Sequence, residues 1–278
     1  MKLLFSEQNS QYGSYRFPYA VWAVPEPGET PADLFQAGFL PSSHQMDRFY
    51  LCRQIRIHLE QFELSSENRR ILRKGQGFNV ELVPRDKFAY TPARRQFFKA
   101  YADAKFGPEV MSLDRLDSLF AHPVISHLLI YTDSQTGAEV GVAALYLEAN
   151  SLAYYYYAFY DWQHPVRSLG MFMMTAAVEL FAGRGCRHIY LGTCYSEGAL
   201  YKTQFAGAEF FNGFRWSQNL AELKYLLQRD QAPAPQHLLE TDAYRAAFCP
   251  GGLAEMAAAS AFQMHPGKPA GRPDSSLV

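Results

Sequence analysis

The sequence is poor in cysteine, and its few cysteines are not arranged in pairs. Its 278 residues contain four, none of them in a C-x-x-C motif: Cys52, Cys186, Cys194 and Cys249. Zinc ribbons and small disulfide-stabilised scaffolds depend on close cysteine pairs, so this spacing excludes both classes. We therefore expect neither a metal site nor a cofactor.

Long apolar runs and an excess of charge of one sign are also missing. No stretch of about 20 apolar residues occurs, and the apolar run at residues 1–5 is far too short for a signal peptide. The balance of 26 Lys and Arg against 27 Asp and Glu excludes a wholly basic nucleic-acid binder of the histone type. These absences predict a cytoplasmic protein that contacts neither a membrane nor DNA.

Aromatic residues are abundant instead. The chain contains 18 Tyr and 21 Phe, and 48% of its residues are hydrophobic, which excludes a disordered chain. Rings favour strands, so the core is expected to contain β-structure. The length suits one large domain or two small ones.

The order of patterns along the chain predicts an α+β protein in three parts. Residues 1–120 form a small N-terminal region, which is turn-rich over residues 1–50 and in which a partly alternating pattern predicts a strand over 49–62. Residues 121–230 alternate between strands and helices, including helices over 168–183 and 199–205 and a strand over 209–216. Residues 231–278 contain 11 Ala, 6 Pro and 4 Gly, which predicts a largely disordered tail.

One segment departs from the balanced charge. Residues 52–105 contain 12 Lys and Arg but 6 Asp and Glu, an excess of +6. The densest part is a short predicted helix capped by Ser65 or Ser66, with the basic residues Arg69, Arg70, Arg73 and Lys74. These side chains are candidates for contacts with RNA phosphates, although a solvated helix surface explains them equally well in isolation.

The richest candidate site lies between an aromatic strand, 152–160, and a long apolar helix. Helix N-termini present unpaired backbone N–H groups to anions. The connection ends in Arg167, Ser168, Leu169 and Gly170, an R-x-x-G sequence of the kind with which acyl-CoA N-acyltransferases hold a pyrophosphate. An ordinary strand-to-helix connection, with Ser168 as the helix cap, is the alternative.

Four short motifs in this half of the chain resemble one known family. The motifs are Phe159-Tyr160-Asp161, Ser168-Leu169-Gly170, Tyr190-Leu191-Gly192 and Tyr201-Lys202. Their order and spacing resemble the N-end-rule aminoacyl-tRNA–protein transferases, the arginyl- and leucyl-transferases. The basic segment also resembles the one that closes the family's N-terminal domain. The family's N-terminal cysteine cluster is absent, because only Cys52 stands in that region.

The resemblance implies an acyl-CoA N-acyltransferase-like mixed sheet flanked by helices over residues 121–230. It also implies transfer of an amino acid, arginine or leucine, from charged tRNA to the α-amino group of a protein N-terminus. The basic segment would then contact tRNA. Two alternatives stay open: an acyl-CoA-dependent N-acyltransferase and a non-catalytic RNA-binding relative.

Roles for individual residues follow from the same resemblance. Lys202 would meet a phosphate, the terminal ribose or an acidic acceptor residue, and Asp161 would act as a general base or cap its loop. The residues around the donor would be Arg167 to Gly170, Gly192, Cys194 and three tyrosines that stack on adenine or bond the ester carbonyl, Tyr157, Tyr190 and Tyr201. Buried packing is the alternative for at least two of the tyrosines and for Cys194.

Overall fold

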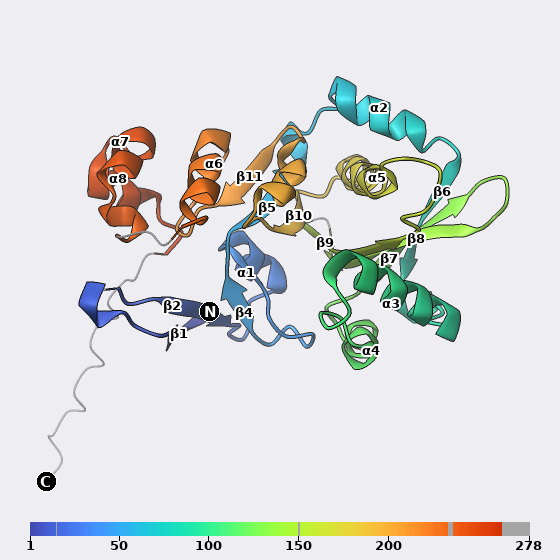
Figure 1. Cartoon of the computed structure of the whole chain (residues 1–278), viewed down its shortest axis with the longest axis horizontal. Helices are drawn as coiled ribbons and strands as arrows, with labels where there is room; N and C mark the ends of the chain where they lie inside the picture. Colours follow the sequence, from blue (N-terminus) through green and yellow to red (C-terminus); the bar gives the residue numbers. More distant parts are fainter. Residues whose placement is uncertain (15, 150, 233–235, 263–278) are drawn as a thin grey trace, which may run out of the picture.

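The computed structural model describes residues 1–14, 16–149, 151–232 and 236–262, and an eight-stranded mixed sheet forms its middle layer (Figure 1). The strands lie in the order β12-β11-β5-β10-β9-β8-β7-β6. β9 and β10 run parallel, whereas the other neighbouring strands run antiparallel. The strands are β5 (Gln54–His58), β6 (Phe78–Pro84), β7 (His127–Asp133), β8 (Glu139–Glu148), β9 (Leu152–Tyr160), β10 (His188–Thr193), β11 (Ala208–Phe211) and β12 (Trp216–Ser217).

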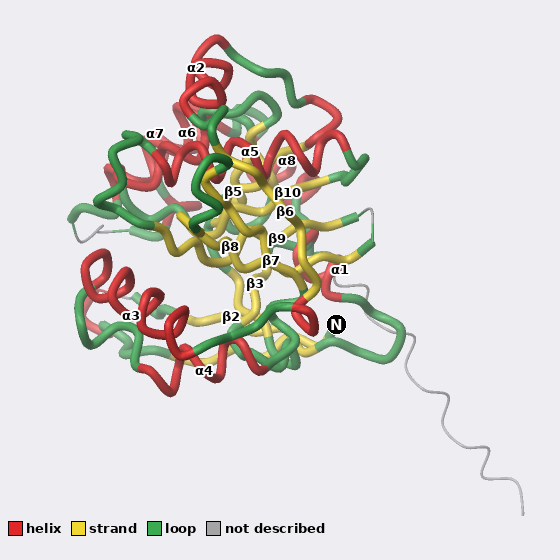
Figure 2. Tube along the Cα trace, turned by 90° about the vertical axis from the view of Figure 1, so that its right-hand side faces the viewer, coloured by secondary structure: helices red, strands yellow, loops and turns green. Residues whose placement is uncertain are grey.

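Helices cover both faces of this sheet, as Figure 2 shows. One face packs against α2 (Ser66–Lys74), α5 (Leu169–Gly183) and α6 (Leu220–Arg229), which share one hydrophobic core with it. The other face packs against α1 (Pro31–Gln36), α3 (Pro92–Phe106) and α4 (Leu113–Ala121), which belong to a second core. The predicted mixed α+β sheet flanked by helices is therefore confirmed.

A smaller sheet adjoins the second core. Its four strands lie in the order β1-β2-β4-β3, and they are β1 (Lys2–Glu7), β2 (Tyr19–Val24), β3 (Phe39–Pro41) and β4 (Phe49–Leu51). The strand predicted over 49–62 is thus divided, because β4 pairs in the small sheet and β5 pairs in the large one. β5 carries part of the predicted N-terminal region into the centre of the large sheet.

Local sequence determines where several helices begin. Ser65 Oγ accepts a hydrogen bond from Asn68 N at the start of α2, and Thr91 Oγ1 accepts one from Arg94 N at the start of α3. Two other predictions were wrong in detail. The helix expected over 199–205 is a 3₁₀ segment, Glu197–Thr203, and the strand expected over 209–216 is the β11–β12 hairpin, which turns where Gly213 has a φ of 112°.

The region predicted as a disordered tail contains two helices, α7 (Asp242–Phe248) and α8 (Gly252–Ala259). The prediction of disorder is wrong for residues 236–262, because Tyr244, Cys249 and Met256 are buried in the first core. The Tyr244 hydroxyl also donates a hydrogen bond to Glu222 Oε1 of α6 at 2.6 Å. Residues 263–278 lie outside the described part of the chain. Within that part, no helix combines the length and the apolar character needed to span a bilayer.

Candidate active site

The large sheet opens at its centre, between the parallel strands. β9 and β10 pair from Leu152 to Tyr154, and beyond Tyr154 they separate. β9 also bulges there, since Ala144 of β8 pairs with Tyr157 and Leu145 pairs with Tyr155. On the β10 side the chain turns at Gly192, whose φ of 80° lies in the left-handed region that favours glycine.

A cavity of about 1150 Å³ occupies this opening. Its walls come from β9, the loop 161–168, the start of α5, the end of β10, the 3₁₀ segment and the end of α3. It brings together most of the candidate site residues that the sequence predicted: Tyr157, Asp161, Arg167, Ser168, Leu169, Gly170, Gly192, Tyr201 and Lys202. Four motifs that are separated along the chain therefore share one space.

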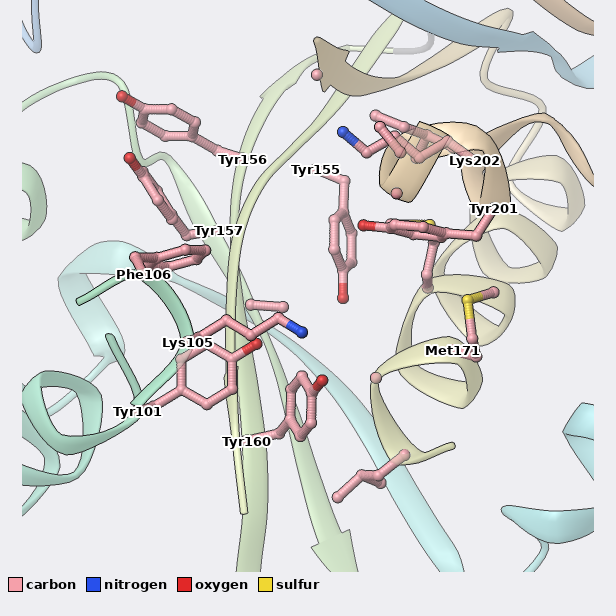
Figure 3. A pocket seen from close by; sticks show the side chains of 18 of the residues that line it. Tyr101, Lys105, Phe106, Tyr155, Tyr156, Tyr157, Tyr160, Met171, Tyr201 and Lys202 are labelled. Atoms are coloured by element: carbon pink, nitrogen blue, oxygen red, sulfur yellow. The ribbon is translucent and has the colours of Figure 1, made fainter. Parts of the chain in front are cut away.

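The run of tyrosines on β9 lines the cavity from both sides of the strand (Figure 3). Tyr155 points toward Tyr201 and Met171, whereas Tyr156 and Tyr157 lie on the opposite side of β9, near Phe106. The rings of Tyr156 and Tyr157 lie 4.6 Å apart between centroids. β9 thus separates a side lined by Tyr155, Tyr201 and Met171 from a side lined by Tyr156, Tyr157 and Phe106.

Lys202 of the 3₁₀ segment lines the cavity, and its amine is bonded to the end of β10. Its Nζ donates a hydrogen bond to the Thr193 carbonyl at 2.8 Å, and among the described residues no carboxylate pairs with it. Burial lowers the pKa of Lys202, and the nearby Cys194 opposes this effect. A larger fraction of neutral amine is therefore present at a given pH than in an exposed lysine.

The loop before α5 leaves the start of that helix open. Ser168 has a φ of 73°, in the left-handed region, and its side chain makes no capping hydrogen bond. Asp161 Oδ1 accepts a hydrogen bond from Gln163 N at 2.9 Å, which is the loop-capping role predicted as its alternative. Arg167 is exposed at the rim of the cavity. Uncapped N–H groups beside a cation form a favourable site for an anion.

Gly170 lies against Tyr160. A Cβ atom at position 170 would stand 2.7 Å from both the Cζ and the hydroxyl oxygen of Tyr160. The Tyr160 ring in turn packs on Tyr101 of α3, with 4.8 Å between the centroids. Glycine at position 170 therefore makes room for the cavity-lining ring of Tyr160.

Two predicted site residues lie outside the cavity. Tyr190 is 2% exposed, packs on Phe35 with 5.0 Å between centroids, and accepts a 3.5 Å hydrogen bond from Arg56 Nη1. Cys194 is fully buried, and burial raises the pKa of its thiol. A protonated, buried thiol is a poor nucleophile, so the packing role predicted as the alternative suits Cys194.

The basic segment lies on α2, on the outer side of α5 (Figure 1). Arg70 pairs with Glu67, and Arg69 Nη1 donates to the Leu64 carbonyl. The side chains of Arg73 and Lys74 make no hydrogen bond or ion pair with the described residues. These cations are outside the cavity, and half of them are free to meet a partner.

Sequence reasoning missed several residues that line the cavity, notably Tyr155 of β9 and Tyr101, Lys105 and Phe106 of α3. The α3 residues belong to no motif, and only the tertiary packing of α3 against β9 brings them to the site. For Tyr155 a signal existed, because side chains alternate along a strand and four consecutive tyrosines must line both of its sides.

Comparison with curated proteins identifies related sequences. The chain is 28% identical over 156 residues to an aspartate/glutamate leucyltransferase from Methylorubrum populi, and this match covers 51% of the chain and 60% of the relative. It is 28% identical over 175 residues to the enzyme of the same name from Alkalilimnicola ehrlichii, covering 61% and 72%. The matched segment thus spans 60% of the length of the first of these relatives. No family model matches the chain.

Solved structures give weaker similarities. L-PGS from Bacillus licheniformis has a TM-score of 0.40 at 11% identity, over 66% of each chain. A GCN5-related N-acetyltransferase from Sphaerobacter thermophilus has a TM-score of 0.34 at 13% identity, over 69% of this chain and 57% of the other. The resemblance to the N-end-rule aminoacyl-tRNA–protein transferases, predicted from four short motifs, is confirmed by the sequence similarity to aspartate/glutamate leucyltransferases.

Proposed function

We propose that this protein transfers an amino acid from aminoacyl-tRNA to the α-amino group of a protein N-terminus. The observation that carries the proposal is the single cavity in which the four family motifs meet. The names of the curated relatives favour leucine over arginine as the donated amino acid and acidic N-terminal residues as acceptors.

The charges and rings of the cavity suit the end of a tRNA. Three cations line it, Lys105, Arg167 and Lys202, against one carboxylate, Asp161. The donor end of a charged tRNA consists of phosphodiesters and an unpaired adenosine, which bind cationic groups and aromatic faces respectively. Tyr157 and Tyr201 provide such faces on the two sides of β9. The open N-terminus of α5 adds donors for a phosphate.

The reaction demands little from the protein beyond placement and removal of a proton. Aminoacyl-tRNA is an activated ester, and an α-amino group, with a pKa of about 7.7–8.0, is partly neutral at physiological pH. The amine nitrogen attacks the ester carbonyl carbon, and the bond to the ribose oxygen breaks. Lys202 in its neutral form accepts a proton from the attacking nitrogen and returns it to the ribose oxygen, so no proton is gained or lost.

The basic residues of α2 would bind the tRNA outside the cavity. α2 lies on α5, whose N-terminus opens into the cavity, so a tRNA whose end enters the site can extend over α2. Arg73 and Lys74 are the members of the group with no partner in the described chain. Long cationic side chains at this position neutralise phosphates without reading sequence.

The experiment that tests the function is direct transfer. Purified protein is incubated with tRNA charged with leucine or arginine and with peptides that begin with Asp, Glu, Lys or Arg, and the peptides are then weighed by mass spectrometry. The proposal expects a mass gain of one amino acid on a subset of the peptides. Uncharged tRNA and N-acetylated peptides are the controls, and no mass gain on any peptide contradicts the proposal.

An acyl-CoA donor is the second candidate. It is favoured by one observation, the uncapped start of α5 next to Arg167, which would also hold a pyrophosphate. Calorimetry with acetyl-CoA separates the two donors, because heat of binding is expected only for the second. A protein that binds tRNA but transfers nothing would be the non-catalytic relative.

A further inference from the structure

The hydroxyl group of Tyr155 has no hydrogen-bond partner among the described residues, although its side chain is almost completely buried. Tyr155 is 5% exposed, and none of the residues that the structure describes bonds its oxygen. Other buried tyrosines differ: the Tyr131 hydroxyl donates to the Met173 carbonyl at 2.7 Å, and Tyr244 donates to Glu222. A buried polar atom without a partner destabilises a fold, so such atoms are rare and call for an explanation.

The position of Tyr155 in the fold offers an explanation for the missing partner. It is the first residue of β9 after the parallel pairing with β10 ends at Tyr154, and it lines the cavity. Its ring points into the space between β9 and α5, toward Tyr160 and Tyr201 (Figure 3). Lys202 enters the cavity on the same side of β9. A group that occupies this space is therefore the candidate for the missing partner.

We propose that the Tyr155 hydroxyl is a catalytic group that donates a hydrogen bond to the carbonyl oxygen of the transferred aminoacyl ester. This inference rests on the proposed function, which supplies the ester. When the acceptor nitrogen bonds to the carbonyl carbon, the electron pair of the C=O bond moves to this oxygen. The pair returns when the bond to the ribose oxygen breaks. Tyr155 stabilises the transient negative charge and keeps its own proton throughout.

The surroundings suit a hydrogen-bond donor better than an acid. Burial raises the pKa of Tyr155 well above its usual value, so the phenol stays protonated at any physiological pH. Met171, Met174 and Leu191 line the cavity together with Tyr155, and the hydroxyls of Tyr160 and Tyr201, toward which its ring points, make no hydrogen bond to it. A hydrogen bond in such an environment is stronger than the same bond in water.

The test compares Tyr155→Phe with Tyr131→Phe in the full-length protein. Both changes remove one buried tyrosine hydroxyl from a strand of the large sheet, but within the described part of the chain only the Tyr131 hydroxyl has a partner. Steady-state transfer of leucine from charged tRNA to an acceptor peptide gives kcat and KM, and a thermal melt gives Tm. Losing one donor to a developing oxyanion is expected to lower kcat about 100-fold. For Tyr155→Phe we expect that loss with nearly unchanged KM and an unchanged or higher Tm. For Tyr131→Phe we expect a lower Tm and nearly unchanged kcat.

The outcomes separate this inference from the proposed function. If wild-type protein transfers and Tyr155→Phe retains its kcat, the inference fails and the function stands. If wild-type protein transfers nothing from any charged tRNA, the proposed function fails and the catalytic role fails with it. A Tm that falls as far in Tyr155→Phe as in Tyr131→Phe shows that the hydroxyl has a structural partner, which also overturns the inference.

Discussion

Replacing Lys202 tests the proton transfer at the centre of the proposed mechanism. Lys202→Met removes the amine and keeps the apolar stem, and Lys202→Arg keeps the positive charge but supplies a guanidinium that does not deprotonate. If Lys202 accepts the proton, both variants should lose about 100-fold or more in kcat. If its role is only to attract phosphate, Lys202→Arg should remain active. The two variants thus distinguish a base from a charge.

The structure also fixes the expected stability and pH dependence. Lys202→Met loses the hydrogen bond to Thr193, worth about 1 kcal/mol, and it also removes a poorly solvated charge, which opposes that loss of stability. Because the pKa of Lys202 is lowered from 10.5, its neutral form increases as pH rises and does so below the range of an exposed lysine. Wild-type kcat should therefore rise with pH in that range.

The assay is transfer of radiolabelled leucine to a peptide between pH 6 and 10, with thermal melts of every variant. Lys105→Arg is the matched control, because Lys105 also lines the cavity. If Lys105 acts only through its positive charge, the pH profile of kcat in Lys105→Arg should equal that of the wild-type protein. A Lys202→Arg protein with wild-type kcat and an unchanged pH profile would refute the assignment of Lys202 as proton acceptor.

Three further predictions concern other parts of the chain. Gly170→Ala should displace the Tyr160 ring and reduce transfer, whereas Gly183→Ala, at the open end of the same helix, should leave transfer unchanged; equal rates in the two variants would contradict this reading of Gly170. The double variant Arg73→Ala, Lys74→Ala should bind tRNA more weakly, and the slope of log binding constant against log salt concentration should flatten by about 0.7–0.9 per lost phosphate contact. The double variant Arg69→Ala, Arg70→Ala should show smaller changes, and filter-binding titrations measure both. Burial, with Arg56, His58 and Arg187 nearby, lowers the pKa of His188 to about 3. Because His188 binds its proton at higher pH in the unfolded chain than in the folded one, the free energy of unfolding should fall as the pH drops from 6.5 toward 3. Denaturant titrations should show a smaller fall in His188→Leu than in the wild-type protein.

Local features were predictable from the sequence because neighbouring residues determine them. Thr91 and Pro92 begin α3, and Ser65 caps α2, as their chemistry requires. The connection from β9 to α5 was also predictable, since an aromatic strand, a polar loop and an apolar helix follow one another without interruption. The residues of this connection do line the cavity.

The remaining parts depend on contacts between distant segments, which a single sequence does not reveal. Nothing near Gln54–His58 indicates that it pairs with β10 and β11. Alanine and proline in the tail suggested disorder, because the composition does not show that Tyr244 finds Glu222. Tyr190 was expected at the site from its motif, yet alternation along β10 turns its ring toward Phe35 instead.

The position of β5 has a consequence for how the chain reaches this structure. β5 comes early in the sequence, but both of its neighbours in the sheet, β10 and β11, come late. During synthesis it must wait without its partners until the ribosome has produced most of the chain. Such non-local pairing slows folding, and it leaves both edges of this strand accessible to other chains in the meantime. β5 joins the early and late segments of the chain in one sheet. A fragment that ends before β10 would therefore lack both strands that flank β5. A fragment that begins after β5 would leave β10 and β11 without the strand that connects them.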